Sequence, residues 1–554
     1  MTAQKRTPQP PPHRTTTGAL IRNAANQNGD ATFVVCGDRQ LTYQDAERES
    51  AALALGLLRA GAGKGTRVGL LAPNGPDWVV GWLAATRIGA VTSLLNTYHR
   101  ARELSRILRH GDTQILLTAD RHLDHDYLAR LEEIMTIEGQ RHERLALLSH
   151  PFLRSVSVWG KADRDWCGSV EDLVVRGREL DPLLLDAIEE EVHPADPAVI
   201  VYSSGTTADP KGVIHSHGAM VRHAHNLWPF RDLTVDDVVY TPMPLFWVGG
   251  LSFTLIGAMH AGATLVFEDR FEPGATLKLL ERERVTQVLG WPHMGAALAN
   301  HPTFRDRDLS SIRATTLVEL LPPDKRSGDP TLRPNSLGMT ETLGPHTIGD
   351  PDEQLRPEER GSFGRPVPGV EHRIVDPRTA KDSAPGELGE LWVRGSSVML
   401  GLYKREREEV FTSDGWYRSG DAGYFDADGH FYFKGRLGEQ IKSSGVNVTP
   451  REVELVLEEQ PGVQMAIVMG VPHPQRGEDV AALVVLTPGT QVGSDTLRER
   501  VKKELASYKV PRHVAIFGDQ TDLPWLPSGK VDRRAVHALL IHQFGESRQS
   551  LEAL

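Results

Sequence analysis

Cysteine is scarce in this sequence, with Cys36 and Cys167 the only two among 554 residues. Two cysteines are too few for a disulfide framework or for a metal site built on thiolates. The scarcity indicates a reducing compartment, and the cytoplasm is the location that we expect.

Runs of basic residues are also missing, and the formal net charge is −11. Because binding to the phosphates of nucleic acid needs a basic face, this composition argues against a general nucleic-acid binder. It leaves open a small anionic ligand that a few placed cations hold. With 40% hydrophobic and 24% charged residues, the composition is that of an ordinary soluble globular protein.

The sequence has no clean membrane span. Its two notable apolar runs are interrupted, residues 79–95 by Arg87 and residues 249–267 by His260 and several glycines. We expect both runs to form buried helix and strand. The first fifteen residues are polar and rich in proline, so 1–15 is expected to be a disordered tail and not a signal peptide.

The length indicates at least two domains, because one hydrophobic core rarely serves 554 residues. From residue 41 the pattern alternates: 43–60 and 78–89 are helical, and 67–71 and 90–94 are short apolar strands. Strands separated by helices of ten or more residues indicate parallel α/β layers. The expected fold class is therefore α/β.

The pattern changes after about residue 386, where short strands are joined by tight turns. These strands are predicted at 390–394, 423–425 and 430–434. A compact pattern follows, which predicts a helix at 450–459, strands at 464–470 and 480–486, a helix at 494–505 and a strand at 513–517. We therefore expect a large N-terminal part made of several subdomains and a separate small α/β domain.

The strongest chemical signal is a loop that follows the apolar strand 198–202 and ends at a lysine. It consists of Ser203, Ser204, Gly205, Thr206 and Thr207, followed by Ala208, Asp209, Pro210 and Lys211. Backbone N–H groups, hydroxyls and one cation can together hold a polyphosphate. The loop lacks the spacing of a Walker A motif, so the mechanics of P-loop NTPases do not apply. A flexible surface loop is the alternative.

This loop resembles the phosphate loop of the adenylate-forming superfamily, which includes acyl-CoA synthetases, luciferases and the adenylation domains of peptide synthetases. Further matches arrive in the family's order: Gly338-Met339-Thr340-Glu341, Tyr417-Arg418-Ser419-Gly420-Asp421, Gly435-Arg436 and Pro527-Ser528-Gly529-Lys530. The resemblance extends over nearly the whole chain and is nearest to bacterial acyl-CoA ligases. It implies a large adenylating domain at residues 16–436 and a small mobile domain at residues 437–554.

The resemblance implies a role for each matched polar residue. Glu341 would bind the Mg²⁺ that neutralises the phosphates of ATP, and Thr340 would donate to the α-phosphate, whereas a helix cap is the structural alternative. Asp421 would accept from the ribose hydroxyls and Arg436 would bind ribose or phosphate oxygens, whereas a turn and a surface ion pair are the alternatives. Lys530 would bridge the acid's carboxylate and the α-phosphate, where charge builds up. The ATP-binding set is then Ser203, Ser204, Gly205, Thr206, Thr207, Lys211, Gly338, Met339, Thr340, Asp421, Arg436 and Lys530, and the catalytic set is Lys530, Thr340 and Glu341.

The pocket for the acid is expected to be apolar. Residues 244–250 resemble a family segment in which many acyl-CoA and hydroxycinnamate ligases place a histidine where this chain has Trp247. An indole carries no charge, so Trp247 would shape the pocket and leave the carboxylate to Lys530. Such walls favour a hydrophobic acid that is medium-sized or contains a ring. The candidate wall residues are Trp247, Val248, Gly249, Trp291, Leu337, Met339 and Leu343.

The sequence departs from the family's pattern near adenine and at the hinge. The usual glycine-rich turn and tyrosine before the GMTE motif are replaced by residues 316–323 and Leu337, so adenine would be held differently. The hinge position is Gly438, whose wide φ/ψ range permits rotation of the small domain. The channel for coenzyme A would be lined by Ser443, Ser444 and Gly445.

Four other patterns are not assigned to a functional site. Residues 61–66 (GAGKGT) follow a helix and precede a strand, so left-handed glycines that end the helix are expected there. Residues 426–429 (DADG) begin like a calcium loop without its remaining ligands, so a hairpin turn is favoured. Two His-x-His patterns within residues 215–225 have no further ligand that the sequence identifies, and no structural metal is assigned.

The sequence therefore predicts an AMP-forming acid–thiol ligase. The carboxylate of a small organic acid would attack the α-phosphate of ATP and release pyrophosphate, and coenzyme A would then take the acyl group from the acyl-AMP. An amide synthetase and a loader of carrier proteins are the alternatives within the superfamily, and a non-catalytic nucleotide- or acyl-binding relative is the alternative of another class. The expected cofactors are ATP and Mg²⁺, with coenzyme A as co-substrate, and a homodimer is left open.

Overall fold

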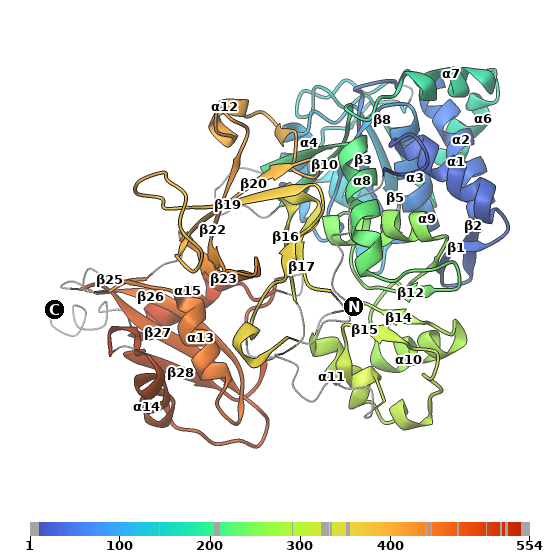
Figure 1. The fold of residues 1–554 in the computed structure, drawn as a ribbon. Coiled ribbons are helices and arrows are strands. Elements are labelled where there is room, and N and C mark those ends of the chain that lie inside the picture. The colour runs from blue at the N-terminus through green and yellow to red at the C-terminus, as the bar shows by residue number, and fades with distance from the viewer. Residues whose placement is uncertain are drawn as a thin grey trace. The chain divides into compact units, whose positions relative to one another are not determined.

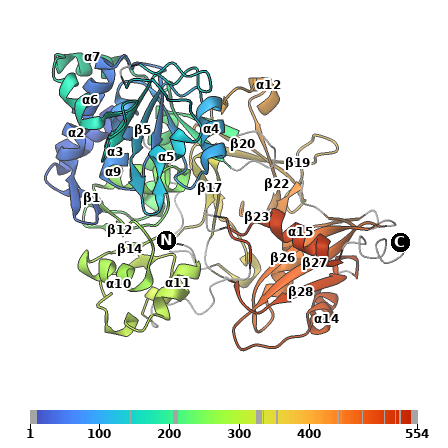
Figure 2. The ribbon, with the colours of Figure 1, turned by 180° about the vertical axis from the view of Figure 1, so that it is seen from behind.

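The computed structural model describes most of the chain, in the residue ranges 10–142, 144–203, 211–290, 292–322, 332, 335–350, 355–437, 441–443, 446–473, 476–505, 507–520, 523–526 and 530–544. Its contacts divide the chain into two compact units (Figures 1 and 2). The first comprises Met1–Glu371 and Val393–Tyr417, and the second comprises His372–Trp392 and Arg418–Leu554. The rotation of the small domain stays a prediction.

The first unit contains an eight-stranded sheet. Its strands are β3 (Arg67–Leu71), β4 (Val91–Leu94), β5 (Ile115–Ala119), β8 (Ser155–Trp159), β9 (Gly168–Ser169), β10 (Pro197–Ser203), β11 (Lys211–Ser216) and β21 (Gly401–Leu402). They lie in the order β21-β11-β10-β4-β3-β5-β8-β9, and the strands from β10 to β9 are parallel neighbours, whereas β11 and β21 pair antiparallel. The predicted parallel α/β layers are confirmed.

Three further sheets belong to the described part of this unit. The six-stranded sheet, in the order β15-β14-β12-β13-β1-β2, contains β1 (Thr32–Cys36), β2 (Arg39–Thr42), β12 (Val238–Tyr240), β13 (Thr264–Phe267), β14 (Gln287–Val288) and β15 (Ala314–Thr315). The three-stranded sheet contains β16 (Ser336–Met339), β17 (Gly344–Ile348) and β18 (Arg365–Pro366). A two-stranded ribbon is formed by β6 (Arg121–His122) and β7 (His125–Asp126).

Helices cover the sheets of the first unit, and α2 lies against α3 and α6 (Figures 1 and 2). Their bounds are α1 (Thr17–Asn28), α2 (Tyr43–Arg59), α3 (Pro76–Arg87), α4 (Ala101–His110), α5 (Tyr127–Glu132), α6 (Val170–Gly177), α7 (Leu183–Glu191), α8 (His217–Leu227), α9 (Gly257–Ala261), α10 (Pro273–Arg282), α11 (Pro292–Ala299) and α12 (Arg407–Val410).

Local sequence explains where α2 begins and ends. The hydroxyl of Thr42 accepts from the N–H of Asp45 and the Asp45 carboxylate accepts from the N–H of Thr42, which is a capping box. Beyond its last turn, Gly61 and Gly65 have φ of +86° and +81°. Because glycine adopts this left-handed region without steric cost, the 61–66 segment ends the helix as predicted.

Both apolar runs are buried helix and strand. The first forms α3 and β4, and the side chain of Arg87 within it is fully buried between two carboxylates. Arg87 lies 2.8 Å from Glu47 and also pairs with Glu189, so its charge is compensated inside the core. The second run forms the π-helix Gly249–Ile256, α9 and β13. Every helix among the described residues falls short of the length and apolarity that a membrane span needs.

The predicted loose tail does not hold for residues 13–15. The guanidinium of Arg14 donates to the carbonyl of Glu190 at 2.7 Å, and the hydroxyl of Thr15 accepts from Arg222 at 3.0 Å. These polar contacts to segments about two hundred residues away in the sequence hold this part of the chain, and composition alone gave no sign of them. Residues 1–9 lie outside the described part of the chain.

Among its described residues, the second unit forms two sheets. A four-stranded sheet has the order β19-β20-β22-β23, and a five-stranded sheet has the order β25-β24-β27-β26 with β28 parallel to β27. The bounds are β19 (Val370–Val375), β20 (Gly389–Gly395), β22 (Tyr417–Phe425), β23 (Phe431–Arg436), β24 (Ile441–Ser443), β25 (Val446–Val448), β26 (Val463–His473), β27 (Gly477–Leu486), β28 (His513–Phe517), α13 (Pro450–Glu458), α14 (Ser494–Glu504) and α15 (Arg533–Phe544). The predicted small α/β pattern is confirmed element by element to within a few residues.

The β22–β23 connection is the hairpin turn expected at residues 426–429. The carboxylate of Asp426 accepts from the N–H groups of Asp428 and His430, at 3.0 and 2.8 Å, and Gly429 has φ of +81°. An aspartate that binds the backbone of its own turn is a structural residue.

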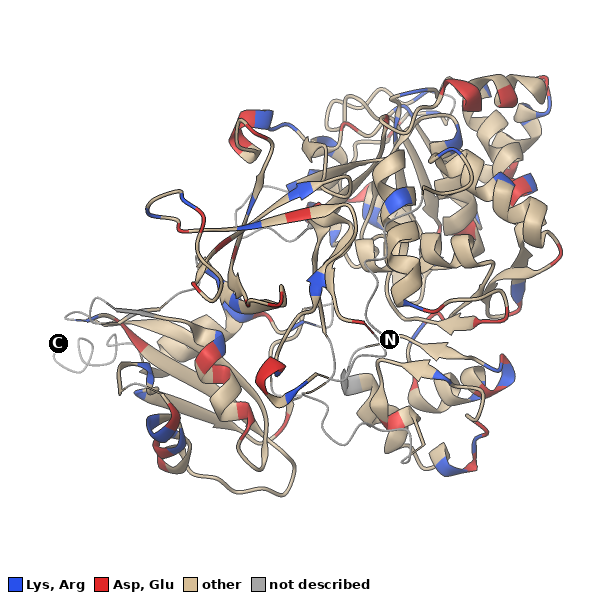
Figure 3. Cartoon of the chain, in the orientation of Figure 1, with Lys and Arg blue, Asp and Glu red and all other residues tan. Residues whose placement is uncertain are grey.

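Lys and Arg are interspersed with Asp and Glu on helices, loops and strands of both units (Figure 3). On α14, Arg500 pairs with Glu504 and Lys502 with Glu499, at 3.3 and 3.2 Å. Such exposed pairs keep a helix in water and contribute little to stability.

Candidate active site

Lys211 and Glu341, which come from two different motifs, meet in the first unit. Lys211 is the first residue of β11, and Glu341 lies in the turn Thr340–Thr342 that joins β16 to β17. The ammonium of Lys211 donates to Oε1 of Glu341 in a short ion pair. The side chain of Glu341 is only 10% exposed, so the pair is largely screened from water.

Tyr417 completes this cluster. Its hydroxyl donates to Oε1 of Glu341 at 3.1 Å and accepts from the ammonium of Lys211 at 3.3 Å. Burial opposes ionisation of Glu341, but the charge and hydrogen bond of Lys211, with the Tyr417 hydroxyl, hold the pKa of Glu341 below its ordinary value. Glu341 is therefore an ionised carboxylate inside the protein.

The backbone of the Thr340–Glu341 turn is held from two sides. Nε2 of His215 lies 2.8 Å from the carbonyl oxygen of Thr340, and the N–H of Met399 donates to the carbonyl of Glu341 at 2.8 Å. Burial lowers the pKa of His215 to about 4, so the imidazole is neutral and donates from Nε2. Because side chains alternate along a strand, Lys211 and His215 lie on the same face of β11.

Glycine is required at the start of the GMTE motif. A Cβ at Gly338 would lie 2.4 Å from the backbone of Gly344 on the neighbouring strand. The turn between these strands also needs a left-handed residue, Leu343, with φ of +61°. Close approach of β16 and β17 thus fixes where Thr340 and Glu341 lie.

Asp421 and Arg436 lie on adjoining strands of the second unit, opposite each other in the β22–β23 register. Nε of Arg436 is 3.0 Å from Oδ1 of Asp421, and the arginine side chain is 52% exposed against 5% for the aspartate. The N–H of Asp421 donates to the hydroxyl of Ser419 at 3.0 Å. The ion pair that was the alternative for Arg436 is present, and its partner is the other predicted ribose-binding residue.

The segment predicted to contact the acid is tied down by an asparagine. Nδ2 of Asn74 donates to the carbonyl of Met243 and Oδ1 accepts from the N–H of Leu245, both at 2.8 Å. Next to this clamp, Trp247 is partly buried, and its ring centroid lies 5.3 Å from that of Phe246. Val248 packs against the same hydrophobic core, and Gly249 begins the π-helix.

The other predicted wall residues lie in different surroundings. Leu343 is fully buried in the core against which Trp247 and Val248 pack. Met339 instead packs with Val213 and Met399, and Leu337 is partly buried on β16. Trp291 lies outside the described residues.

Of the remaining predicted residues, Lys530, Ser443 and Ser203 lie within the described part of the chain. Lys530 is exposed, and its carbonyl accepts from the N–H of Leu526 at 2.8 Å, next to a bridge between Trp525 and Val531. Ser443 is buried at the end of β24. Ser203 ends β10 opposite Lys211. The residues that fall outside the described part of the chain are Ser204, Gly205, Thr206, Thr207, Gly438, Ser444 and Gly445.

Sequence reasoning missed three residues that hold the site, namely Tyr417, His215 and Asn74. The alternation of side chains along β11 could have identified His215, since it places residue 215 on the same face of the strand as Lys211. Tyr417 was quoted within a motif without a role, because its partner Glu341 lies 76 residues earlier in the chain. Nothing in the sequence pointed to Asn74, which binds residues about 170 positions away.

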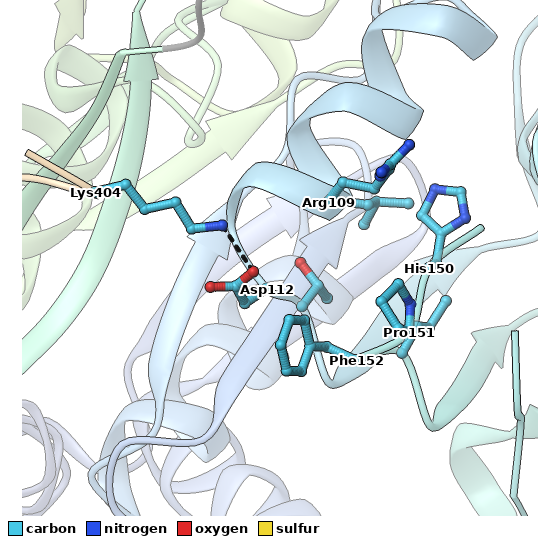
Figure 4. Close-up of a pocket in the computed structure, with 9 residues that line it drawn as sticks. Arg109, Asp112, His150, Pro151, Phe152 and Lys404 are labelled. Carbon is cyan, nitrogen blue, oxygen red and sulfur yellow. Dashed lines mark hydrogen bonds and ion pairs between the residues drawn. The ribbon is translucent and has the colours of Figure 1, made fainter. Parts of the chain in front are cut away.

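A separate pocket of about 210 Å³ lies at the end of α4 (Figure 4). Arg109, His150 and Phe152 line it, and Lys404 crosses to Asp112 at 2.8 Å. The residues predicted to bind ATP, acid or coenzyme A are not among those that line it. We therefore place the candidate site at Lys211 and Glu341.

Comparison with known families matches both units. The family of AMP-binding enzymes matches residues 21–403, and the C-terminal domain of AMP-binding enzymes matches residues 452–530. The fold and the matched motifs thus define an adenylate-forming enzyme. The chain belongs to the AMP-binding enzymes, and it is an enzyme of their AMP-forming acid–CoA ligase family.

Individual relatives cover nearly the whole chain. The feruloyl-CoA synthase of an Amycolatopsis species is 33% identical over 512 residues, which are 92% of this chain and 95% of the relative. The sulfoacetate–CoA ligase of Cupriavidus necator is 31% identical over 531 residues, which are 94% of this chain and 96% of the relative. A crystal structure of the anthranilate CoA ligase AuaEII in complex with anthranoyl-AMP has a TM-score of 0.79 and 25% identity, covering 95% of this chain and 98% of that chain.

Proposed function

We propose that this chain activates a hydrophobic, medium-sized or ring-containing carboxylic acid as its acyl-AMP and transfers the acyl group to coenzyme A. The observation that carries the proposal is the contact between Lys211 and Glu341, which are 130 residues apart in the sequence. They come from the two motifs expected to hold the phosphates of ATP. A contact between these motifs is what a site for a polyphosphate needs.

Mg²⁺ fits the donors of the Thr340–Glu341 turn. Glu341 is ionised and Thr340 adds a hydroxyl, and Mg²⁺ takes hard oxygen ligands from one or two carboxylates together with substrate phosphates. The ion would neutralise phosphate charge when bound. We assign its binding to Glu341, with Lys211 turning from the carboxylate to the phosphates.

The chemistry then requires two steps. In the first, a carboxylate oxygen of the acid bonds to the α-phosphorus and the bond to pyrophosphate breaks. Because both reactants are anions, a cation must lie between them, and Lys530 is the residue proposed for this task. In the second, the sulfur of coenzyme A bonds to the acyl carbon and AMP leaves, with Ser443, Ser444 and Gly445 proposed to line the thiol's path.

The surroundings of Trp247 support a hydrophobic acid. Trp247 packs on Phe246, whose ring centroid lies 6.3 Å from that of Tyr98 in an edge arrangement. Aromatic walls bind apolar and ring-containing ligands better than short polar ones. Two of the relatives are named for the ring-containing acids ferulate and anthranilate, and one is named for sulfoacetate.

A panel of acids tests the proposal. Thioester formation would be measured with coenzyme A and ATP for aryl, medium-chain and sulfonated acids and for acetate and propionate. Aryl or medium-chain acids are expected to have the highest kcat/KM. Acetate, propionate or sulfoacetate as the best substrate would contradict the acid class, and acyl-AMP without thioester would place an amine or a carrier protein as the acceptor.

The proposed setting is the cytoplasm. Cys36 and Cys167 are both free thiols, which supports a reducing compartment.

A further inference from the structure

We propose that Tyr417 is a positioning residue for the magnesium-binding carboxylate, and that its hydroxyl orients Glu341 when Lys211 leaves for the phosphates of ATP. This inference rests on the proposed role of Glu341 in holding Mg²⁺. It assigns to the tyrosine that begins the YRSGD motif a function separate from that of Asp421 in the same motif.

The donor and acceptor groups of Lys211, Glu341 and Tyr417 fix the direction of both hydrogen bonds. An ammonium only donates and an ionised carboxylate only accepts, so the Tyr417 hydroxyl must accept from Lys211 and donate to Glu341. The two contacts are 3.3 and 3.1 Å long. Lys211 and Tyr417 both reach the same oxygen, Oε1. The other oxygen, Oε2, takes neither of these contacts and is the one that we assign to the ion.

ATP binding would remove one of the two donors from Oε1. The ammonium of Lys211 carries a single charge, so a move towards the phosphates weakens its ion pair with Glu341. Once Lys211 turns away, the Tyr417 hydroxyl is the donor that remains on Oε1 from this cluster. It would prevent rotation of the carboxylate and keep Oε2 directed to the ion.

The ring of Tyr417 is anchored independently of its hydroxyl. Tyr417 is 7% exposed and packs with Val213, Met399 and Phe411. The ring centroids of Phe411 and Tyr417 lie 6.1 Å apart at an interplanar angle of 64°, an edge arrangement. Removing the hydroxyl while retaining the ring therefore leaves this packing in place, which makes Tyr417→Phe a selective change.

Nucleotide binding measured with and without the ion separates positioning from packing. Calorimetric titration of the full chain with ATP would be done in Mg²⁺ and in EDTA, for the wild type, Tyr417→Phe and Glu341→Gln. For Tyr417→Phe we expect about tenfold weaker binding in Mg²⁺, the loss typical of one hydrogen bond to a charged group. Binding in EDTA should stay within about twofold of the wild type, since this readout does not involve the ion.

Tyr43→Phe is the matched control. The hydroxyl of Tyr43 is also buried and donates to the carbonyls of Ala258 and Ala263, at 3.0 and 2.8 Å, among residues that the site does not include. This variant is expected to lower the unfolding temperature without changing the ratio of the two dissociation constants. The control thus measures what a buried tyrosine hydroxyl contributes to the fold alone.

The outcomes distinguish this inference from the proposed function. If Mg²⁺ raises the ATP affinity of Tyr417→Phe as much as that of the wild type, but raises the ATP affinity of Glu341→Gln less, the role of Tyr417 alone is overturned. Equal weakening of Tyr417→Phe in Mg²⁺ and EDTA would also overturn it, because the hydroxyl would then act on the nucleotide or the fold. A normal gain in Glu341→Gln would remove the proposed metal role of Glu341, and the inference with it.

Discussion

Asp421 and Arg436 face each other across the β22–β23 hairpin, with Nε of the arginine 3.0 Å from Oδ1 of the aspartate. The two residues expected to bind the ribose are therefore already joined by an ion pair. The buried aspartate fixes one end of the pair, and the arginine, which is 52% exposed, has room to move to a ligand. Binding of ribose hydroxyls by Asp421 would loosen this pair and not the fold.

Asp421→Asn should weaken ATP binding by roughly ten- to a hundredfold, because an amide accepts more weakly than a carboxylate from ribose hydroxyls. The free energy of unfolding should change by about 1 kcal/mol or less, since the exposed guanidinium left behind is solvated. Calorimetry with ATP and urea unfolding measure the two effects. Asp382→Asn, which removes another carboxylate paired with an arginine of the same unit, Arg373, is the control. A large loss of stability with normal ATP binding would assign Asp421 to the fold.

Buried neutral histidines should make stability depend on pH. Burial lowers the pKa of His215 and His217 to about 4 and that of His223 to about 3. The unfolded chain therefore binds protons first as the pH falls below about 6.5, and the free energy of unfolding decreases from there towards pH 4. His215 alone accounts for about 2 kcal/mol between pH 7 and pH 5.

Urea unfolding of the wild type and of His215→Gln at pH 7 and pH 5 measures this contribution. Glutamine keeps a donor for the Thr340 carbonyl but does not titrate, so its decrease in stability should be smaller than that of the wild type. An identical decrease in both proteins would show that His215 does not bind protons differently in the two states.

Asn74→Ala should release the segment that carries Trp247, because it removes both hydrogen bonds that tie Met243 and Leu245. We expect the KM for the acid to rise by about three- to tenfold with the KM for ATP unchanged. Steady-state kinetics with each substrate varied in turn give the two constants. Asn226→Ala is a matched control, since Asn226 also holds a backbone carbonyl, that of Pro368, at 2.9 Å. Equal changes in both variants would leave Asn74 without a special part in binding the acid.

Much of the fold could be predicted because it depends on local patterns. The alternation of strands and helices located β3, α3 and β4, and the turn at Asp426 followed from its own neighbours. The contacts of the site are of another kind, since they join segments that are far apart in the chain. A motif identifies Glu341, but it does not say that Tyr417 and Lys211 share one of its oxygens. The same limit applies to Arg14, whose partner lies 176 residues away.

Lys530→Ala should affect only one half of the reaction. Adenylation is expected to fall by about a hundredfold or more, the loss typical of removing one preorganised donor at a transition state. Thioester formation from supplied acyl-AMP should remain close to normal, because no bond between two anions forms in that step. Lys502→Ala, which removes another exposed lysine of the same unit, is the control. Equal loss in both steps would contradict the assignment of Lys530 to adenylation alone.

The central claim, that the chain forms an acyl-AMP, is tested most directly by acid-dependent exchange of labelled pyrophosphate into ATP. The exchange needs no coenzyme A and therefore isolates the first step. We predict exchange with at least one aryl or medium-chain acid and its loss in both Lys530→Ala and Glu341→Gln. A folded wild-type protein that binds ATP but supports no exchange with any acid would contradict the claim and leave a non-catalytic nucleotide-binding protein.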